Sequence, residues 1–247
     1  MKFKLRTLIL TVYLPAFLTA MSVGMLAPII PAKVDLIGGT VFVIGLAVGA
    51  RGLGEAIFSI PTGVLIIKLG NKSTMLLGMI GMSVFALLSG ITDNNLILYI
   101  WLFCLGIFYG FFSLSRHSFL TQIVPREFRG KAFSRFGGIN RIGWFFGPVI
   151  GGFTAGSIGV NIPFYIVAAI SLLTTFIILF GHDPSNYTNA NGHVDQTPES
   201  TLNTFKAHKQ SFAIGGTAQF IMQFLRECRH VLIPVWAFSI GLGVEQL

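Results

Sequence analysis

Two groups of ionisable residues lie inside long apolar stretches of the sequence, where they could hold a charged solute or carry a proton. Arg51 and Glu55 are separated by one helical turn, and the other group runs from Arg226 to His230. Charged side chains at mid-membrane depth are costly and persist mainly where they face a protein interior or a water-filled path. We therefore predict an intramembrane ion pair between Arg51 and Glu55.

Polar residues also recur every three or four positions along two of these stretches, a spacing that puts them on one helical face. They are predicted to line a substrate or coupling path: Tyr109, Ser113, Arg116 and His117 in the first stretch, and Gln223, Arg226 and the adjacent Glu227 in the second. Glu55 and Glu227 are the candidate proton carriers. Three structural alternatives stay open: an ion pair that only holds helices in register, extension of the Arg116 side chain toward the membrane surface, and inert, hydrogen-bonded histidines.

The composition indicates which elements must position these residues. Of the 247 residues, 53% are hydrophobic and 11% are charged, which does not suit a soluble globular protein. Seven apolar runs are long enough to cross a bilayer as helices: 7–30, 41–67, 75–91, 96–124, 137–157, 162–180 and 212–240. Membrane barrels use alternating segments of about ten residues instead. The sequence therefore predicts an all-α, polytopic membrane protein.

Basic residues are distributed unevenly between the two sides of this topology. With the amino terminus inside, most of the Lys and Arg residues beside the spans lie on the inner side, and the outer loops hold only Lys33. This asymmetry predicts a cytoplasmic amino terminus and a location in the plasma membrane or bacterial inner membrane. It also accounts for the net charge of +8 without a nucleic-acid partner.

Several other chemistries find no support in the sequence pattern. Cys104 and Cys228 are too few for a disulfide framework or a metal site, and we expect neither a metal nor a cofactor. No hydrolase triad, phosphate-binding loop or dinucleotide fingerprint is recognisable, so we expect a protein that is not an enzyme. A seven-helix receptor would place its amino terminus outside, opposite to the basic-residue bias.

A polar segment divides the chain unequally. We expect a six-helix bundle at 1–181, a cytoplasmic linker at 182–210 and the first helix of a second bundle at 211–247. The Ile-Ile-Pro sequence at 29–31 recurs as Leu-Ile-Pro at 232–234. Repeated six-helix bundles build one class of transporter, with the solute site between them. We therefore expect a fragment that lacks the rest of a carboxy-terminal half.

Two motifs connect these observations to a known family. The segment from Gly63 to Lys72 resembles the G-x-L-x-D-R-x-G-R-R loop of the major facilitator superfamily. Gly143, Gly147, Pro148, Gly151 and Gly152 reproduce G-x-x-x-G-P-x-x-G-G, the antiporter motif of the drug and proton exchange branches of that family. The resemblance implies a gating role for Gly63, Lys68, Gly70 and Lys72. It also implies a solute path lined by the first, fourth and seventh helices. Apart from any family, glycines at every fourth position let two helices pack closely in lipid.

The chain departs from the family pattern at three places. Ile67 stands where the loop usually has an aspartate, and Leu102 stands where proton-coupled members often carry an arginine. The first predicted span has no acidic residue. These differences argue against ordinary proton-coupled drug export.

Together, these features lead us to expect a secondary active transporter that moves a small solute through the lipid bilayer by alternating access. Export or antiport would be coupled to a proton or sodium gradient. Arginines outnumber carboxylates inside the spans, so the expected solute is anionic or zwitterionic. The alternative is a non-transporting membrane scaffold or an uncoupled facilitator half.

Overall fold

Six α-helices account for almost all of residues 12–180, which a computed structural model describes together with individual helical positions between 209 and 236. The helices are α1 (Leu14–Leu36), α2 (Val41–Ile57), α3 (Ser59–Ile91), α4 (Asn95–Ile123), α5 (Arg126–Ser157) and α6 (Ile162–Phe180). No strand occurs among these residues, and the all-α prediction is confirmed. The path residues predicted on the seventh span, Gln223, Arg226 and Glu227, lie outside the described residues.

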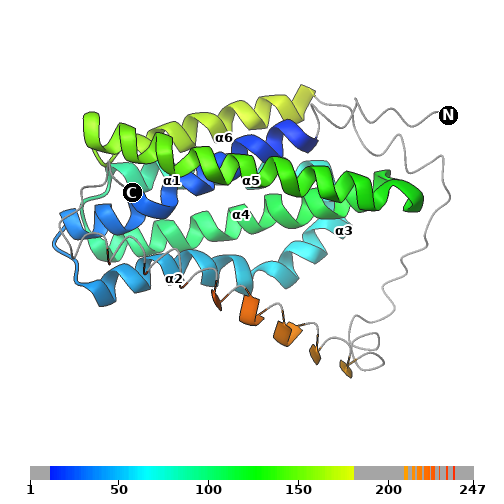
Figure 1. Ribbon diagram of the computed structural model, residues 1–247, viewed down its shortest axis with the longest axis horizontal. Helices are drawn as coiled ribbons and strands as arrows, with labels where there is room; N and C mark the ends of the chain where they lie inside the picture. Colours follow the sequence, from blue (N-terminus) through cyan, green and yellow to red (C-terminus); the bar gives the residue numbers. More distant parts are fainter. Residues whose placement is uncertain are drawn as a thin grey trace.

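The helices lie lengthwise beside one another and form a bundle (Figure 1). α1 packs most extensively against α5, and α4 packs against both α3 and α2, while α6 covers α3 and part of α1. Four of the helices, α1, α3, α4 and α6, are long and apolar enough to cross a membrane. The outward faces of α3, α4 and α6 carry large apolar side chains, as expected of helices that meet lipid instead of water.

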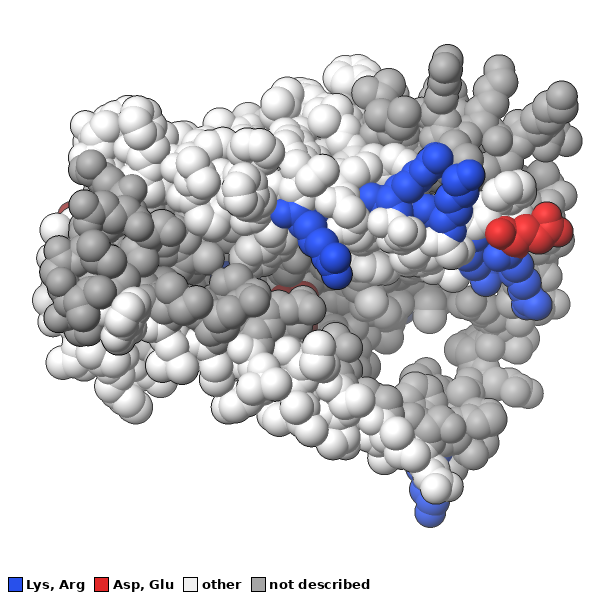
Figure 2. Space-filling view, in the orientation of Figure 1, with Lys and Arg blue, Asp and Glu red and all other residues white. Residues whose placement is uncertain are grey.

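Some predicted helix ends are wrong, for two physical reasons. α1 continues past Ile30 to Leu36, because its two prolines, Pro28 and Pro31, are accommodated within the helix. α5 begins at Arg126 and not at residue 137, because a helix that leaves the apolar layer can continue through basic residues. The basic side chains of this first half of α5 gather toward one end of the bundle (Figure 2).

The predicted second span and the loop after it also need correction. α2 ends at Ile57, and after a break at Phe58 the chain continues as α3, so the span from 41 to 67 is two helical pieces. Residues 63–72 are helical except Gly70, which has φ 81° and ψ 165°. The change of chain direction that was predicted as a loop therefore takes place at Gly70. Essentially only glycine adopts this backbone conformation.

Buried apolar side chains form two clusters. One includes Phe112, Phe119 and Phe136, and the other includes Leu98, Leu102 and Phe164. Leu102, which stands where related proteins often have arginine, is fully buried within the second cluster. The polar residues discussed below are set into α2 and α4 against this apolar background.

Candidate functional site

α2 and α4 cross at close range because glycines lie at the crossing. A Cβ atom at Gly54 would lie 3.1 Å from the amide nitrogen of Ile107, and one at Gly106 would overlap the carbonyl group of Arg51. Any side chain at these two positions would push the helices apart. The glycines therefore bring the middle of α2, with its two charged residues, directly against α4.

Tyr109 lies at the centre of the polar residues gathered at this crossing. Its hydroxyl group interacts with Ser113 one turn along α4, and its side chain is within electrostatic range of Arg51, Glu55 and Arg116. Nη1 of Arg51 is buried and has no hydrogen-bond partner within the described part of the chain. Glu55 does have an interaction partner. The ion pair between Arg51 and Glu55 stays a prediction.

Arg116 is enclosed in the bundle. Its side chain is 2% exposed, and the guanidinium carbon lies 4.7 Å from the ring centroids of both Phe112 and Phe136. Cation–π contacts of this kind stabilise a desolvated guanidinium. Nε and Nη1 are nevertheless buried without a hydrogen-bond acceptor in the described residues. A buried cation with unsatisfied donors costs free energy, so this arginine calls for an explanation beyond packing.

His117 follows Arg116 in the sequence, but its side chain has different surroundings. Its Nδ1 atom lies 2.7 Å from the carbonyl oxygen of Ser113, and its ring meets the ring of Phe136 edge-on at 5.2 Å. The hydrogen bond is made within one turn of α4, and the side chain is exposed. These contacts fit the hydrogen-bonded alternative for this histidine and do not by themselves indicate proton transfer.

The antiporter-motif glycines face α1. Cβ atoms at Gly143, Gly147 and Gly151 would lie 2.5 to 2.9 Å from backbone carbonyl oxygens of α1. Gly24 of α1 lies opposite, where its own Cβ would be 3.3 Å from Cδ of Pro148. Gly152 is buried next to this line. Small residues on both helices thus let the backbones of α1 and α5 come into direct contact.

The residues predicted to have a gating role lie at the turn within α3 and on either side of it. Lys68 and Gly70 are exposed and Gly63 is in the helix before the turn. Lys72 is half-buried and has an interaction partner. Asn71 donates a hydrogen bond of 2.9 Å from Nδ2 to Oε1 of Gln122 and so joins the turn to the end of α4.

Two features were missed by reasoning from the sequence. The glycine crossing of α2 and α4 was missed because a glycine in one helix does not show which other helix packs against it. Lys33 was expected in an outer loop, but its side chain is fully buried at the end of α1. Its signal in the sequence was a lone lysine closely following an apolar run and two prolines.

No metal-binding arrangement is evident in the residues that the structure describes. No group of three or more His, Cys, Asp or Glu side chains is close enough to hold a metal ion there. Cys104 and Cys228 are both free thiols. The polar residues around Tyr109 can form ionic and hydrogen-bonding contacts.

Comparison with known proteins agrees with this architecture. The family model of the major facilitator superfamily matches residues 12–245. An uncharacterized MFS-type transporter from Methanocaldococcus jannaschii is 27% identical over 82% of this chain and 53% of its own length. The quinolone resistance protein NorA of Staphylococcus aureus is 29% identical over 74% of this chain and 47% of its own length. The chain spans about half the length of the curated relatives it matches. It therefore belongs to the major facilitator superfamily and is an integral, multi-pass membrane protein.

Proposed function

We propose that this chain is part of a secondary active transporter that moves a small solute by alternating access, in export or in antiport. The observation that carries the proposal is the gathering of Arg51, Glu55 and Arg116 around Tyr109 within two mostly apolar helices. Ionisable groups within membrane-spanning helices are retained mainly for solute or ion pathways. Family membership supports the same function.

In this proposal, residues 1–181 form one six-helix bundle, 182–210 form a cytoplasmic linker, and 211–247 begin a second bundle. The solute site would lie between the bundles, as in other transporters built from repeats. The amino terminus would be cytoplasmic, so that the exposed basic residues in the first half of α5, such as Lys131 and Arg135, meet the inner face of a plasma or bacterial inner membrane.

The proposed solute is anionic or zwitterionic. α2 and α4 together contain two arginines, Arg51 and Arg116, and one carboxylate, Glu55. Both arginines have buried nitrogen atoms without an acceptor among the described residues. A carboxylate or phosphate group of a solute would supply such acceptors when helix movement opens the site. Arg226, predicted on the seventh span, would add a further cation to the same path.

Energy for transport would come from an ion gradient. No nucleotide-binding motif is recognisable in the sequence, so proton or sodium movement is the proposed driving force. Leu102 and Ile67 lack the charges that many relatives use. Glu55 is accordingly the proposed coupling group on α2, because it lies within electrostatic range of Tyr109.

Transport by the full-length protein in proteoliposomes tests this function. A fluoroquinolone is a suitable first probe because it carries both a carboxylate and an amine, and a relative is named for quinolone resistance. We expect probe movement with an imposed proton or sodium gradient and none after the gradient is collapsed. Arg116→Gln should lower the apparent affinity ~10-fold or more, the size of one lost charge-assisted hydrogen bond.

Arg126→Gln is the matched control, because Arg126 is exposed at the start of α5. It removes the same charge from the same chain and should leave the affinity unchanged. A cationic dye serves as the comparison solute. Gradient-driven movement of the dye but of no anionic or zwitterionic compound would contradict the proposed solute class, and no gradient-driven movement of any probe would contradict the proposed function.

A further inference from the structure

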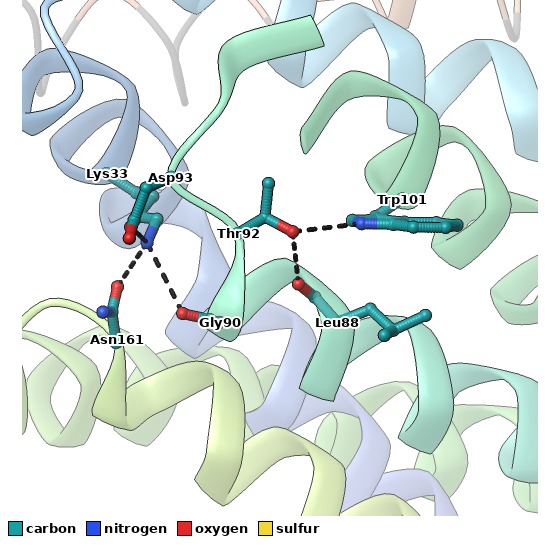
Figure 3. Close-up of polar contacts among 7 residues, drawn as sticks. All are labelled: Lys33, Leu88, Gly90, Thr92, Asp93, Trp101 and Asn161. Atoms are coloured by element: carbon teal, nitrogen blue, oxygen red, sulfur yellow. Dashed lines mark hydrogen bonds and ion pairs between the residues drawn. The ribbon is translucent and has the colours of Figure 1, made fainter. Parts of the chain in front are cut away.

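Lys33 is a fully buried lysine whose ammonium group joins three separate parts of the bundle (Figure 3). Nζ donates to Oδ1 of Asn161 at 2.6 Å, to Oδ1 of Asp93 at 3.2 Å and to the carbonyl oxygen of Gly90 at 3.5 Å. Gly90 is in the last turn of α3, where a cation is favoured by the exposed carbonyl groups. The three donors of the ammonium group thus reach α3, the α3–α4 connection and the α5–α6 connection.

The α3–α4 connection that Lys33 contacts is itself firmly held. Oγ1 of Thr92 donates to the carbonyl oxygen of Leu88 at 2.8 Å and accepts from Nε1 of Trp101 at 3.1 Å (Figure 3). Asn94 caps α4 by accepting from the backbone amides of Leu96 and Ile97. Lys33 is therefore bound to a fixed part of the bundle.

α1 has a weak segment immediately before this contact. Pro28 and Pro31 lie inside the helix and cannot donate backbone hydrogen bonds, so two successive turns each lack one. Before these prolines, α1 is packed backbone to backbone against α5 at Gly24. After them, Val34 is buried in the apolar core and the Lys33 side chain adds polar contacts at the end of α1.

We propose that Lys33 is a positioning residue for transport: its ammonium group makes the end of α1 beyond Pro28 and Pro31 move with α3 and α6 as one body. This inference rests on the proposed function, since alternating access requires a bundle that moves as a unit. Without the ammonium contacts, the end of α1 would bend at the prolines, and the bundle would transmit its movement poorly to the solute path.

Asp93 and Asn161 contribute differently to this contact. Asp93 is 83% exposed, so water competes for its carboxylate and its ion pair contributes little. The bond to Asn161 is the shortest of the three and is partly buried. We therefore expect Asn161→Ala to have a larger effect than Asp93→Asn.

Hydrogen exchange of the purified full-length protein tests the contact independently of transport. Lys33→Met keeps the apolar stem and removes the ammonium group. We expect exchange at residues 32–37 to rise ~10-fold in this variant, as one lost charge-assisted hydrogen bond would produce. Asp35→Asn is the matched control, because it changes an exposed charge two residues away and should leave exchange unchanged.

Transport kinetics then separate positioning from solute binding. Lys33→Met should lower the maximal rate ~10-fold while KM changes little, because the solute contacts are intact. Rescue by a conservative variant adds a test that a space-filling role would not pass. Lys33→Arg keeps a positive charge and N–H donors at this position, and we expect its maximal rate and its exchange to lie nearer to the wild type than those of Lys33→Met.

Three results would overturn the inference. The first is a hydrogen-exchange rate at residues 32–37 that equals the wild-type rate in both Lys33→Met and Asn161→Ala, when both variants are folded. The second is faster hydrogen exchange in Lys33→Met together with an unchanged maximal transport rate. The third is failure of both variants to fold while Asp35→Asn folds, which would make Lys33 a folding element only. If the wild-type protein transported no solute but exchange changed as expected, the proposed function would fail while the contact itself stood.

Discussion

Gly147 of α5 lies against Gly24 of α1 so closely that a Cβ atom at Gly147 would be 2.8 Å from the Cα atom of Gly24. The same Cβ would be 2.5 Å from the carbonyl oxygen of Met21. Backbone cannot move aside in the way that the end of a flexible side chain can. The contact between α1 and α5 is therefore fixed by the absence of a side chain at this position.

Gly147→Ala should destabilise the protein by about 1–3 kcal/mol, because the added methyl group must separate two packed helices. The measurement is the thermal unfolding midpoint in detergent. Gly137→Ala is the control on the same helix, since a Cβ there meets nothing within 4 Å. It should be neutral or stabilising by up to about 1 kcal/mol through helix propensity. Equal midpoints for the two variants would contradict the close contact.

Arg116→Met should raise the stability of the protein although it removes a charged residue. Replacing a buried, incompletely paired charge by an apolar side chain of similar size is often stabilising by about 1–4 kcal/mol. The lost cation–π contacts with Phe112 and Phe136 oppose this by about 1–2 kcal/mol. Arg116→Lys keeps the charge but loses the planar group between the rings, so its unfolding midpoint should fall below that of the wild type. A midpoint for Arg116→Met that is also below wild type would show that the guanidinium is satisfied structurally.

Gly70→Ala should cost about 1–3 kcal/mol even though there is free space around the glycine. Its φ of 81° with ψ of 165° lies in a region that is essentially restricted to glycine. Gly63→Ala, in the same motif but within the helix, should cost nothing, since a Cβ there meets nothing within 4 Å. Circular dichroism and thermal unfolding of the two variants measure the difference. A neutral Gly70→Ala variant would contradict the positive φ at the turn.

Arg129 should stabilise the end of α4 through backbone contacts. Its Nε and Nη2 atoms donate to the carbonyl oxygens of Val124 and Thr121 at 3.1 and 2.9 Å. Arg129→Ala removes both bonds and should cost about 1–2 kcal/mol, with faster hydrogen exchange at residues 121–125. Arg126→Ala serves as the control, because it removes an exposed arginine of the same helix. Identical exchange in both variants would argue against this capping role.

The existence of the six helices could be predicted because each contains a long apolar run. Their ends could not be predicted from the same signal. The run in α1 stops at Ile30 because prolines and Lys33 follow, yet the helix continues to Leu36 since its neighbours bury that lysine. In α5, the basic residues between 126 and 136 interrupt the apolar signal, although a helix outside the apolar layer does not need a continuous apolar run.

The glycine face of α5 could be predicted from the spacing of its glycines, but the helix that packs against this face could not. A spacing of four shows that one side of a helix is small, and it carries no information on which helix lies opposite. The same limit applies to the α2–α4 crossing, where Gly54 and Gly106 become a pair only in three dimensions. Arg116 was predicted to border a path, but its enclosure by Phe136 of α5 depends on a contact between helices that no local pattern encodes.

The central claim is that the polar face of α4 borders a path that water and solute can enter. Cysteine accessibility at Ser113 tests it most directly, because Ser113 lies on that face, half-buried and beside Tyr109. In a full-length protein without Cys104 and Cys228, Ser113→Cys should react with a hydrophilic thiol reagent and be protected by the transported solute. Ser89→Cys, fully buried on α3, should stay unreactive. A Ser113→Cys variant that reacts from neither side of the membrane, with or without a gradient, would contradict the claim.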